Sequence, residues 1–305
     1  MSILTLENVS IRFGKDPPVV CEASFSVETA KTLAVIGETG SGKSVILLAI
    51  LGLLPPVAIT AGAIYFEEQD LLSLSKRQMQ QLRGRSIAYV PQGSGNALNP
   101  LFKIGWQVAE VFRLQGASRQ QAAHQAEEAL EQFGFSDCKK LCGQYPFMLS
   151  GGMRQRILIA TGLAGGATLI LADEPTKGLD YQRMEMVRDA FQKIRNRSIL
   201  CVTHDLNFAK EIADRIVVMY ASALVEESDA QAFFEKPLHP YAQALLEAMP
   251  ENGMQVRAGY APPRTVETKA CHFYHRCAQS IDQCAQVPPL VTLRDRKVRC
   301  WLYAD

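Results

Sequence analysis

The sequence predicts an α/β fold with a mostly parallel sheet, a phosphate-binding loop and a small cysteine-rich C-terminal extension. Apolar segments with the length of buried strands alternate with helical segments through most of the chain, which is the pattern of a parallel sheet with crossover helices. The octapeptide GETGSGKS lies between one such strand and one such helix. After Ala270 the periodicity is weak, and half of the 8 cysteines gather there.

The composition is that of a globular protein. The chain has 305 residues, of which 48% are hydrophobic and 21% charged, enough for one large domain and a smaller one. A net charge of +1 gives no support for a nucleic-acid partner. The N-terminus lacks the pattern of a signal peptide, and the longest apolar run is broken by Pro55 and Pro56, too short to span a bilayer. We therefore expect a cytosolic chain with reduced thiols.

The elements expected from local pattern follow in chain order. The first half should contain short strands over residues 1–36, ending in "TLAVIG", a helix from Lys43 to about Leu54 stopped by Pro55, strands and loops over 62–92, and helices over 100–148. Within the last of these, "SRQQAAHQAEEALEQFG" predicts an amphipathic helix that ends at Gly134. The second half should contain a helix after "LSGGM", a buried strand "TLILAD", a helix over 181–195 and a strand "SILCVTH".

The octapeptide GETGSGKS matches the phosphate-loop pattern in full and lies in the required strand–loop–helix context. Glycines let the backbone curl so that its N–H groups face a polyphosphate, and the following helix adds its positive end. Lys43 is expected to reach the β- and γ-phosphates, and the Ser44 hydroxyl to bind Mg²⁺. The nucleotide-binding residues predicted from this loop are Gly37, Gly40, Ser41, Gly42, Lys43 and Ser44. The alternative is a glycine-rich turn without a ligand.

A second acidic motif, "LILADEPT", supplies the partner that a phosphate loop needs. An apolar strand ends at Asp173, which is predicted to hold Mg²⁺. The adjacent Glu174 is a candidate general base for the attacking water. An acidic strand end without catalytic function is the alternative, and the complete phosphate loop disfavours it.

The stretch "MLSGGMRQR" resembles the signature sequence in the ATPase subunits of ABC transporters. The resemblance implies an ABC-type nucleotide-binding domain of the P-loop NTPase class, with a helical subdomain at about residues 100–155. It further implies that Ser150, Gly151 and Gly152 donate to the γ-phosphate of an ATP held by a second subunit. A simple helix cap at Ser150 is the alternative.

Four further residues match positions of this family. Gln92 in "VPQG" resembles the loop glutamine that contacts Mg²⁺, and Asp180 in "KGLD" follows the acidic strand at the family distance. His204 in "CVTHD" corresponds to the histidine that senses the γ-phosphate, and Phe13 in "IRFG" takes the place of the aromatic residue that stacks on adenine. The resemblance thus implies catalytic roles for Glu174, His204 and Gln92.

The segments "KPLHPYAQALLEAMP" and "ALNP" resemble the oligopeptide, dipeptide and nickel importer branch of the family. This implies a nucleotide-binding domain over 1–235 and an extension over 236–305. It also implies an ATPase that energises import of a solute, above all di- or oligopeptides. A nickel or metal-chelate importer is the alternative in the same class, and a non-transport ABC ATPase of an enzyme assembly is an alternative of another class. Lys177 and Gly178 depart from the branch, which usually has Thr and Ala there.

The branch also implies partners and a location. These are a homologous second ATPase subunit in a head-to-tail dimer, two membrane permease subunits and a separate solute-binding protein. The chain would lie peripherally at the cytoplasmic face of the inner membrane. No nucleic-acid partner is expected.

The C-terminal cysteines have the spacing C-x5-C-x6-C-x15-C, wider than most zinc knuckles. From the residues alone, a [4Fe–4S] cluster, a zinc ion and reduced packing cysteines all remain open. The tail resembles the C-terminal region of peptide-importer ATPases, which implies a [4Fe–4S] cluster on Cys271, Cys277, Cys284 and Cys300. Their distance in sequence from the phosphate-binding residues predicts a structural or sensing role, with nucleotide affinity largely independent of them. Cys138 and Cys142 are expected to be packing residues.

Overall fold

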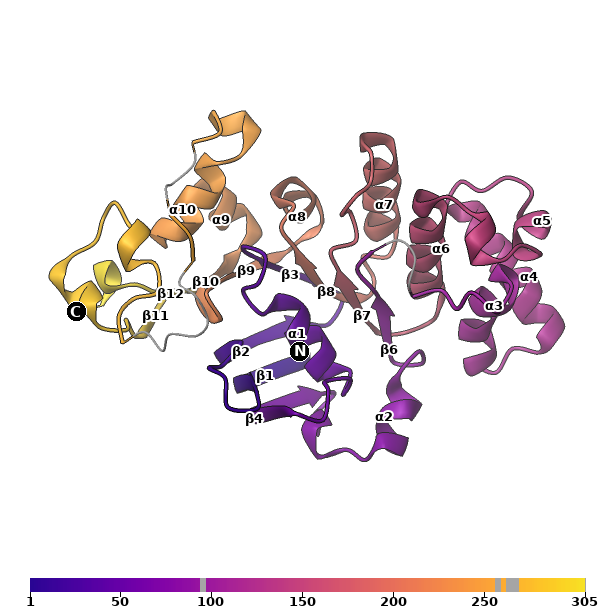
Figure 1. Ribbon diagram of the computed structural model, residues 1–305, viewed down its shortest axis with the longest axis horizontal. Coiled ribbons are helices and arrows are strands. Elements are labelled where there is room, and N and C mark those ends of the chain that lie inside the picture. Colours follow the sequence, from indigo (N-terminus) through magenta and orange to yellow (C-terminus); the bar gives the residue numbers. More distant parts are fainter. Residues whose placement is uncertain (94–96, 256–258, 262–268, 305) are drawn as a thin grey trace. The chain divides into compact units, whose positions relative to one another are not determined.

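A computed structural model of the chain describes residues 1–93, 97–255, 259–261 and 269–304 (Figure 1). The chain forms two compact units. Unit 1 comprises Met1–Leu74 and Val202–Asp305, and unit 2 comprises Ser75–Cys201. Within the described ranges, no helix has the length and apolar character needed to cross a membrane.

Unit 1 begins with an antiparallel sheet. Strand β1 (Ser2–Phe13) pairs with β2 (Val20–Glu28) on one side and with β4 (Ala58–Phe66) on the other, and β4 pairs with the short β5 (Gln69–Asp70). Burial along β2 alternates over much of its length, so one face of this sheet packs on apolar residues and the other is more exposed.

The strands that carry the phosphate loop form the other part of unit 1. Every residue of β3 (Thr32–Ile36) is buried, and β3 runs parallel to β9 (Arg215–Tyr220). Strand β10 (Ala223–Asp229) pairs antiparallel with β9. The C-terminal hairpin of β11 (Leu290–Leu293) and β12 (Arg296–Arg299) adds to this sheet through β12 and β10. The extension is therefore built into the sheet of unit 1.

Among its described residues, unit 1 also contains four α-helices: α1 (Lys43–Ile50), α8 (Leu206–Ile212), α9 (Ala230–Glu235) and α10 (Pro240–Glu247). Short 3-10 turns lie at Leu71–Ser73, Pro250–Asn252, Tyr274–Arg276, Asp282–Ala285 and Trp301–Tyr303. The sequence prediction that α1 extends to about Leu54 is wrong. The helix ends at Ile50 because Gly52 takes a left-handed conformation at φ +60° and reverses the chain before Pro55.

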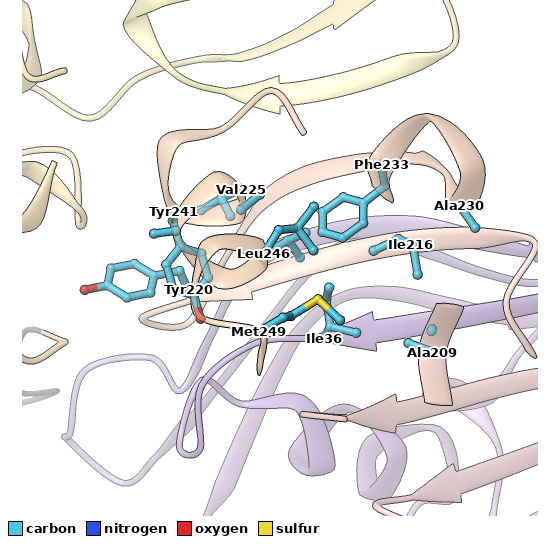
Figure 2. Close-up of a cluster of buried hydrophobic side chains, with 14 of the residues drawn as sticks. Ile36, Ala209, Ile216, Tyr220, Val225, Ala230, Phe233, Tyr241, Leu246 and Met249 are labelled. Atoms are coloured by element: carbon cyan, nitrogen blue, oxygen red, sulfur yellow. The ribbon is translucent and has the colours of Figure 1, made fainter. Parts of the chain in front are cut away.

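One buried cluster joins these strands and helices to the extension (Figure 2). We call it the core cluster; it contains Ala34, Ile36, Ala209, Ile216, Val218, Tyr220, Val225, Ala230, Phe233, Tyr241, Ala242, Ala244, Leu246, Met249 and Phe273. Phe273 belongs to the cysteine-rich segment, and Tyr241 lies on α10. The extension thus shares its core with the strand that leads into the phosphate loop.

In the part of unit 2 that the structure describes, a parallel pair of strands is combined with six helices. Strand β6 (Ile87–Val90) pairs with β7 (Leu169–Asp173). The helices are α2 (Lys76–Leu82), α3 (Ile104–Leu114), α4 (Arg119–Gln132), α5 (Cys138–Cys142), α6 (Gly151–Ala164) and α7 (Tyr181–Lys193), with a 3-10 turn at Pro146–Met148. Strand β8 (Ser198–Thr203) returns the chain to unit 1.

The helix predicted before Gly134 is confirmed as α4. Ser118 and Gln121 form a capping box at its start, and Gly134 follows its end at φ +72°. Cys138 is buried as a packing residue, as expected. The division of the chain at residue 235 remains a prediction, since residues 202–305 belong to one unit together with residues 1–74.

Candidate active site

The phosphate loop connects β3 to α1 and depends on glycine at two close contacts. Gly37 has φ +148°, and a Cβ there would lie 2.0 Å from the carbonyl oxygen of Met219. Gly42 caps α1 at φ +100°, and a Cβ there would lie 2.1 Å from the carbonyl oxygen of Val19. Both positions therefore exclude a side chain by conformation and by contact.

Lys43 lies in the loop with its side chain folded back over it. The residue is only 5% exposed, and its Nζ donates to the carbonyl oxygens of Gly37 and Glu38 at 2.8 Å each. The same nitrogen lies 3.3 Å from the buried Ser41 hydroxyl. Ser44 follows in the first turn of α1. A cation and a helix N-terminus thus meet at one loop, which is the chemistry that binds a polyphosphate.

A cavity of about 440 Å³ lies beside this loop within unit 1. Its walls come from the loop itself, from the β1–β2 connection and from the extension, and include Glu38, Gly40, Pro17, Pro18, His272 and Arg299. Residues separated by more than 200 positions in sequence therefore border one space next to the phosphate loop.

Unit 2 holds the acidic pair. Asp173 is the last residue of β7 and is buried, and its Oδ2 accepts a hydrogen bond from the Tyr89 hydroxyl at 3.4 Å. Burial raises the pKa of Tyr89, and the Asp173 charge raises it further, so the phenol remains a donor. Glu174 is 6% exposed and takes a left-handed conformation at φ +48°. Such strain in a non-glycine residue is typical of functional sites.

The signature segment and the loop glutamine meet in unit 2. Ser150 caps α6, and its hydroxyl accepts from the Met153 N–H at 3.3 Å, so the predicted cap is present. A cavity of about 440 Å³ is lined by Gln92, Gly93, Gly151, Gly152, Gln155, Lys177 and Gly178. Gln155, which the sequence analysis did not assign, donates from Nε2 to the carbonyl oxygens of Pro175 and Lys177 at 3.3 and 2.9 Å. It ties the signature helix to the loop after Glu174.

The remaining predicted residues take simpler positions. Asp180 caps α7 and forms an ion pair with Arg183 at 3.0 Å. His204 is exposed directly after β8, and Phe13 is half-buried at the end of β1. The phosphate-loop residues, Phe13 and His204 belong to unit 1, whereas Gln92, the acidic pair, the signature and Asp180 belong to unit 2.

The four extension cysteines lie in unit 1, and none of them is in a disulfide. Cys284 and Cys300 are buried, while Cys271 and Cys277 pack against the core cluster. Burial raises the pKa of Cys300 to about 11, and the neighbouring thiols of Cys271, Cys277 and Cys284 add to the rise. Among the residues that the structure describes, no three His, Cys, Asp or Glu side chains are arranged to hold a metal ion.

The HPY tripeptide has a clear local function in unit 1. His239 caps α10, and its Nδ1 accepts from the Tyr241 N–H at 3.0 Å. Burial lowers the pKa of His239 to about 3, which keeps the ring neutral and able to accept. Pro240 occupies the first turn of the helix. The Tyr241 hydroxyl then accepts from the Glu38 N–H of the phosphate loop at 2.9 Å.

The cysteine segment is distant in sequence from the phosphate-binding residues, but it contacts the phosphate loop in the fold. Arg276, next to Cys277, donates to the Glu38 carboxylate at 2.9 Å. Glu38, Tyr241 and Arg276 were therefore missed as residues of this site. One feature of the sequence points to this pair. Glu38 lies in the phosphate-loop motif, Arg276 lies next to a cysteine of the C-terminal group, and the two residues have opposite charges.

Comparisons with known proteins agree with this geometry. The family described as ABC transporter matches residues 20–177, and the family described as oligopeptide/dipeptide transporter, C-terminal region, matches residues 225–284. The oligopeptide transport ATP-binding protein AppD of Bacillus subtilis is 36% identical, with 100% of this chain and 98% of AppD covered. The dipeptide transport ATP-binding protein DppD of Escherichia coli is also 36% identical, with coverages of 98% and 96%.

A solved structure gives the same fold. The ATP-binding cassette MJ0796, a dimer bound to ADP and Pi in a post-hydrolysis state, matches with a TM-score of 0.67 and 26% identity, covering 74% of this chain and 98% of the cassette. The predicted ABC-type fold is thus confirmed. The chain belongs to the ABC transporter family, as an ATP-binding and ATP-hydrolysing subunit with a C-terminal region of the oligopeptide/dipeptide transporter type.

Proposed function

We propose that ATP hydrolysis by this chain drives the import of di- or oligopeptides. The observation that carries the proposal is the presence, on one chain, of a complete phosphate-loop module and an extension of the oligopeptide/dipeptide type. Relatives that align over nearly the whole chain are oligopeptide and dipeptide transport ATP-binding proteins. A nickel or metal-chelate importer has no comparable support among them.

In this proposal the loop of unit 1 binds the triphosphate through backbone N–H groups and Lys43, and Phe13 stacks on adenine. Hydroxyl and carboxylate oxygens are the ligands that Mg²⁺ prefers, and Ser44, Asp173 and Gln92 would supply oxygen atoms for it. Glu174 takes a proton from the attacking water, and His204 contacts the γ-phosphate. Ser150, Gly151 and Gly152 serve the ATP of a second, homologous subunit. Asp180 also contributes to the nucleotide site, and its ion-pair partner Arg183 lies next to Gly152.

An exposed apolar surface in unit 2 supports a membrane partner. Leu101 is 80% exposed, and the exposed rings of Phe102 and Trp106 stack with centroids 4.4 Å apart. The Ile104 N–H donates to the Gln144 carbonyl at 2.9 Å, which ties the start of this helix to residue 144, and Phe147 nearby in the chain is also exposed. Apolar patches of this kind mark contact sites. We propose that this surface contacts one of two membrane permease subunits at the cytoplasmic face of the inner membrane, with a separate solute-binding protein on the other side.

Growth of a strain that lacks this chain tests the proposed substrate. Complementation with the wild type should restore growth on a dipeptide that supplies a required amino acid, whereas Glu174→Gln should not, and nickel uptake should be equal in all strains. Restored nickel uptake with no effect on dipeptide growth would instead identify a nickel importer. An effect on neither would point to a non-transport ATPase.

We also propose that Cys271, Cys277, Cys284 and Cys300 hold a [4Fe–4S] cluster. Four thiolates are a complete donor set for such a cluster, and the backbone of Cys271 is hydrogen-bonded to that of Cys284 at 2.9 Å, while Cys284 and Cys300 are buried. The cluster would stabilise the cysteine-rich segment, which has little core of its own. Its distance from the acidic pair in sequence and its apolar surroundings favour a structural or sensing role.

Replacing one ligand tests the cluster. Anaerobically purified wild type should contain about four irons with matching sulfide and a broad absorption near 400 nm, and Cys277→Ser should lose both. Cys138→Ser, a buried cysteine of unit 2, is the matched control and should keep the iron. One zinc per chain without colour would show that the cysteines bind zinc and not a cluster. A metal-free extension that is still folded would show that the cysteines are packing residues.

A further inference from the structure

Glu38, the second residue of the phosphate loop, is held at three different atoms. Its N–H donates to the Tyr241 hydroxyl at 2.9 Å, and its carbonyl oxygen accepts from Lys43 Nζ at 2.8 Å. Its carboxylate oxygen Oε1 accepts from Arg276 Nη1 at 2.9 Å. Two of the three partners, Tyr241 and Arg276, come from the C-terminal extension. The extension therefore holds both the backbone and the side chain of this loop residue.

Arg276 is fixed in position by its surroundings. Its side chain is 13% exposed, and Nη1 also donates to the Tyr220 hydroxyl at 3.1 Å. The guanidinium carbon lies 5.7 Å from the centre of the Tyr220 ring and 5.6 Å from that of Phe273, within range of a cation–π attraction. A largely buried cation with these partners has little freedom to move. It acts as a fixed positive charge beside the loop.

The tyrosine that holds the loop backbone is equally constrained. The rings of Tyr220 and Tyr241 lie 4.4 Å apart, and Phe273 lies 5.3 and 5.5 Å from them. Figure 2 shows Tyr220 and Tyr241 together at one end of the core cluster, away from Ala209 and Ala230. The three rings belong to β9, to α10 and to the cysteine-rich segment. A shift of that segment would therefore displace both Tyr241 and Arg276, the two residues of the extension that hold Glu38.

The charge of Glu38 gives this arrangement a consequence for nucleotide binding. A carboxylate in a loop that binds a polyphosphate repels the phosphate charges. A neighbouring cation reduces this repulsion when it neutralises the carboxylate and holds it away from the phosphates. Arg276 supplies that cation from a position directly before Cys277. The conformation of residues 271–277 is thus coupled to the electrostatics of the phosphate loop.

We propose that Arg276 is a positioning residue of the ATP site, which together with Tyr241 holds Glu38 so that the loop binds ATP tightly. ATP affinity therefore depends on whether the cysteine-rich segment is folded. The inference requires ATP binding by the phosphate loop, and it does not depend on the proposed peptide substrate or on the proposed cluster.

Equilibrium binding of Mg²⁺-ATP to the full-length chain tests this, at fixed ionic strength. Arg276→Met should weaken binding about tenfold, because the Glu38 charge is left uncompensated. Adding Glu38→Gln to that variant should restore affinity to within about threefold of the wild type, since the repelling charge is gone. Arg276→Lys, which keeps the charge, should recover most of the affinity. A purely structural role for Arg276 predicts no rescue by Glu38→Gln.

Lys297→Met is the matched control. Lys297 also joins the extension to the body of unit 1 through a 2.9 Å ion pair, but its partner is Glu227 on β10, which keeps Arg215 at 3.1 Å. This variant should bind ATP like the wild type. The proposal is overturned if Arg276→Met binds ATP normally, if the double variant is as weak as Arg276→Met, or if Lys297→Met is equally weak.

Tyr241→Phe keeps the test decisive even if Arg276→Met does not fold. The variant removes only the hydroxyl that accepts the Glu38 N–H and leaves the stacked rings in place. We expect ATP affinity to fall about threefold to tenfold with the thermal unfolding temperature little changed. Unchanged affinity in a folded Tyr241→Phe chain would contradict the role assigned to the extension.

Discussion

Glu174→Gln should lower the ATPase rate of the assembled transporter by about 10²–10⁴-fold and leave ATP binding intact. Glu174 is buried next to Asp173 at the end of β7, and the strained backbone at φ +48° sets the direction of its side chain. Glutamine has nearly the same shape but cannot take a proton from water. Steady-state phosphate release and equilibrium ATP binding, measured on the same preparation, separate the two effects.

Glu185→Gln is the control for this variant. Glu185 lies on α7 of the same unit, is partly exposed and pairs with Arg188 at 3.3 Å. Its loss should change turnover by less than about twofold, as expected for a surface ion pair. Near-normal hydrolysis by Glu174→Gln would remove Glu174 from the role of general base.

Gly42→Ala is expected to reduce ATP affinity by about a hundredfold or more. The new Cβ would lie 2.1 Å from the Val19 carbonyl oxygen and 3.1 Å from the Val20 side chain, so either the loop or the β1–β2 connection must shift. A displacement of about 1 Å in groups that position a substrate can cost 10²-fold in function. Calorimetric titration with Mg²⁺-ATP measures the loss directly.

Gly14→Ala separates contact from backbone strain. Gly14 also has a positive φ, +58°, but a Cβ there meets no atom within 4 Å. It should lose about 1 kcal/mol of stability at most and bind ATP within about threefold of the wild type. Equal losses of affinity in Gly42→Ala and Gly14→Ala would mean that the Val19 contact does not set the geometry of the loop. Thermal unfolding of both variants shows whether each chain is folded.

The sequence predicted the helix limits that depend on neighbouring residues alone. The helix that became α4 carries a capping box at Ser118 and a glycine after its end, so both of its limits could be read from neighbouring residues. The end of α1 could not, because two terminators compete and Gly52 acts before Pro55.

The candidate site likewise has parts that could be predicted from the sequence and parts that could not. The phosphate loop, the acidic strand end and the signature are continuous segments whose backbone geometry follows from a few adjacent residues, so they were predictable. The contact between Glu38 and Arg276 joins residues 238 positions apart. This contact depends on the packing of β12, α10 and the core cluster, which brings the extension next to the phosphate loop. Such long-range packing cannot be predicted from neighbouring residues in the sequence.

ATP-dependent accumulation of a labelled dipeptide by proteoliposomes tests the central claim most directly. The vesicles would contain this chain with its partner ATPase and permease subunits, ATP inside and the solute-binding protein outside. The account predicts accumulation with the wild type, and none with Glu174→Gln or with a non-hydrolysable ATP analogue. Accumulation that persists in Glu174→Gln, or ATP hydrolysis by the wild type that never accumulates a peptide, would contradict it.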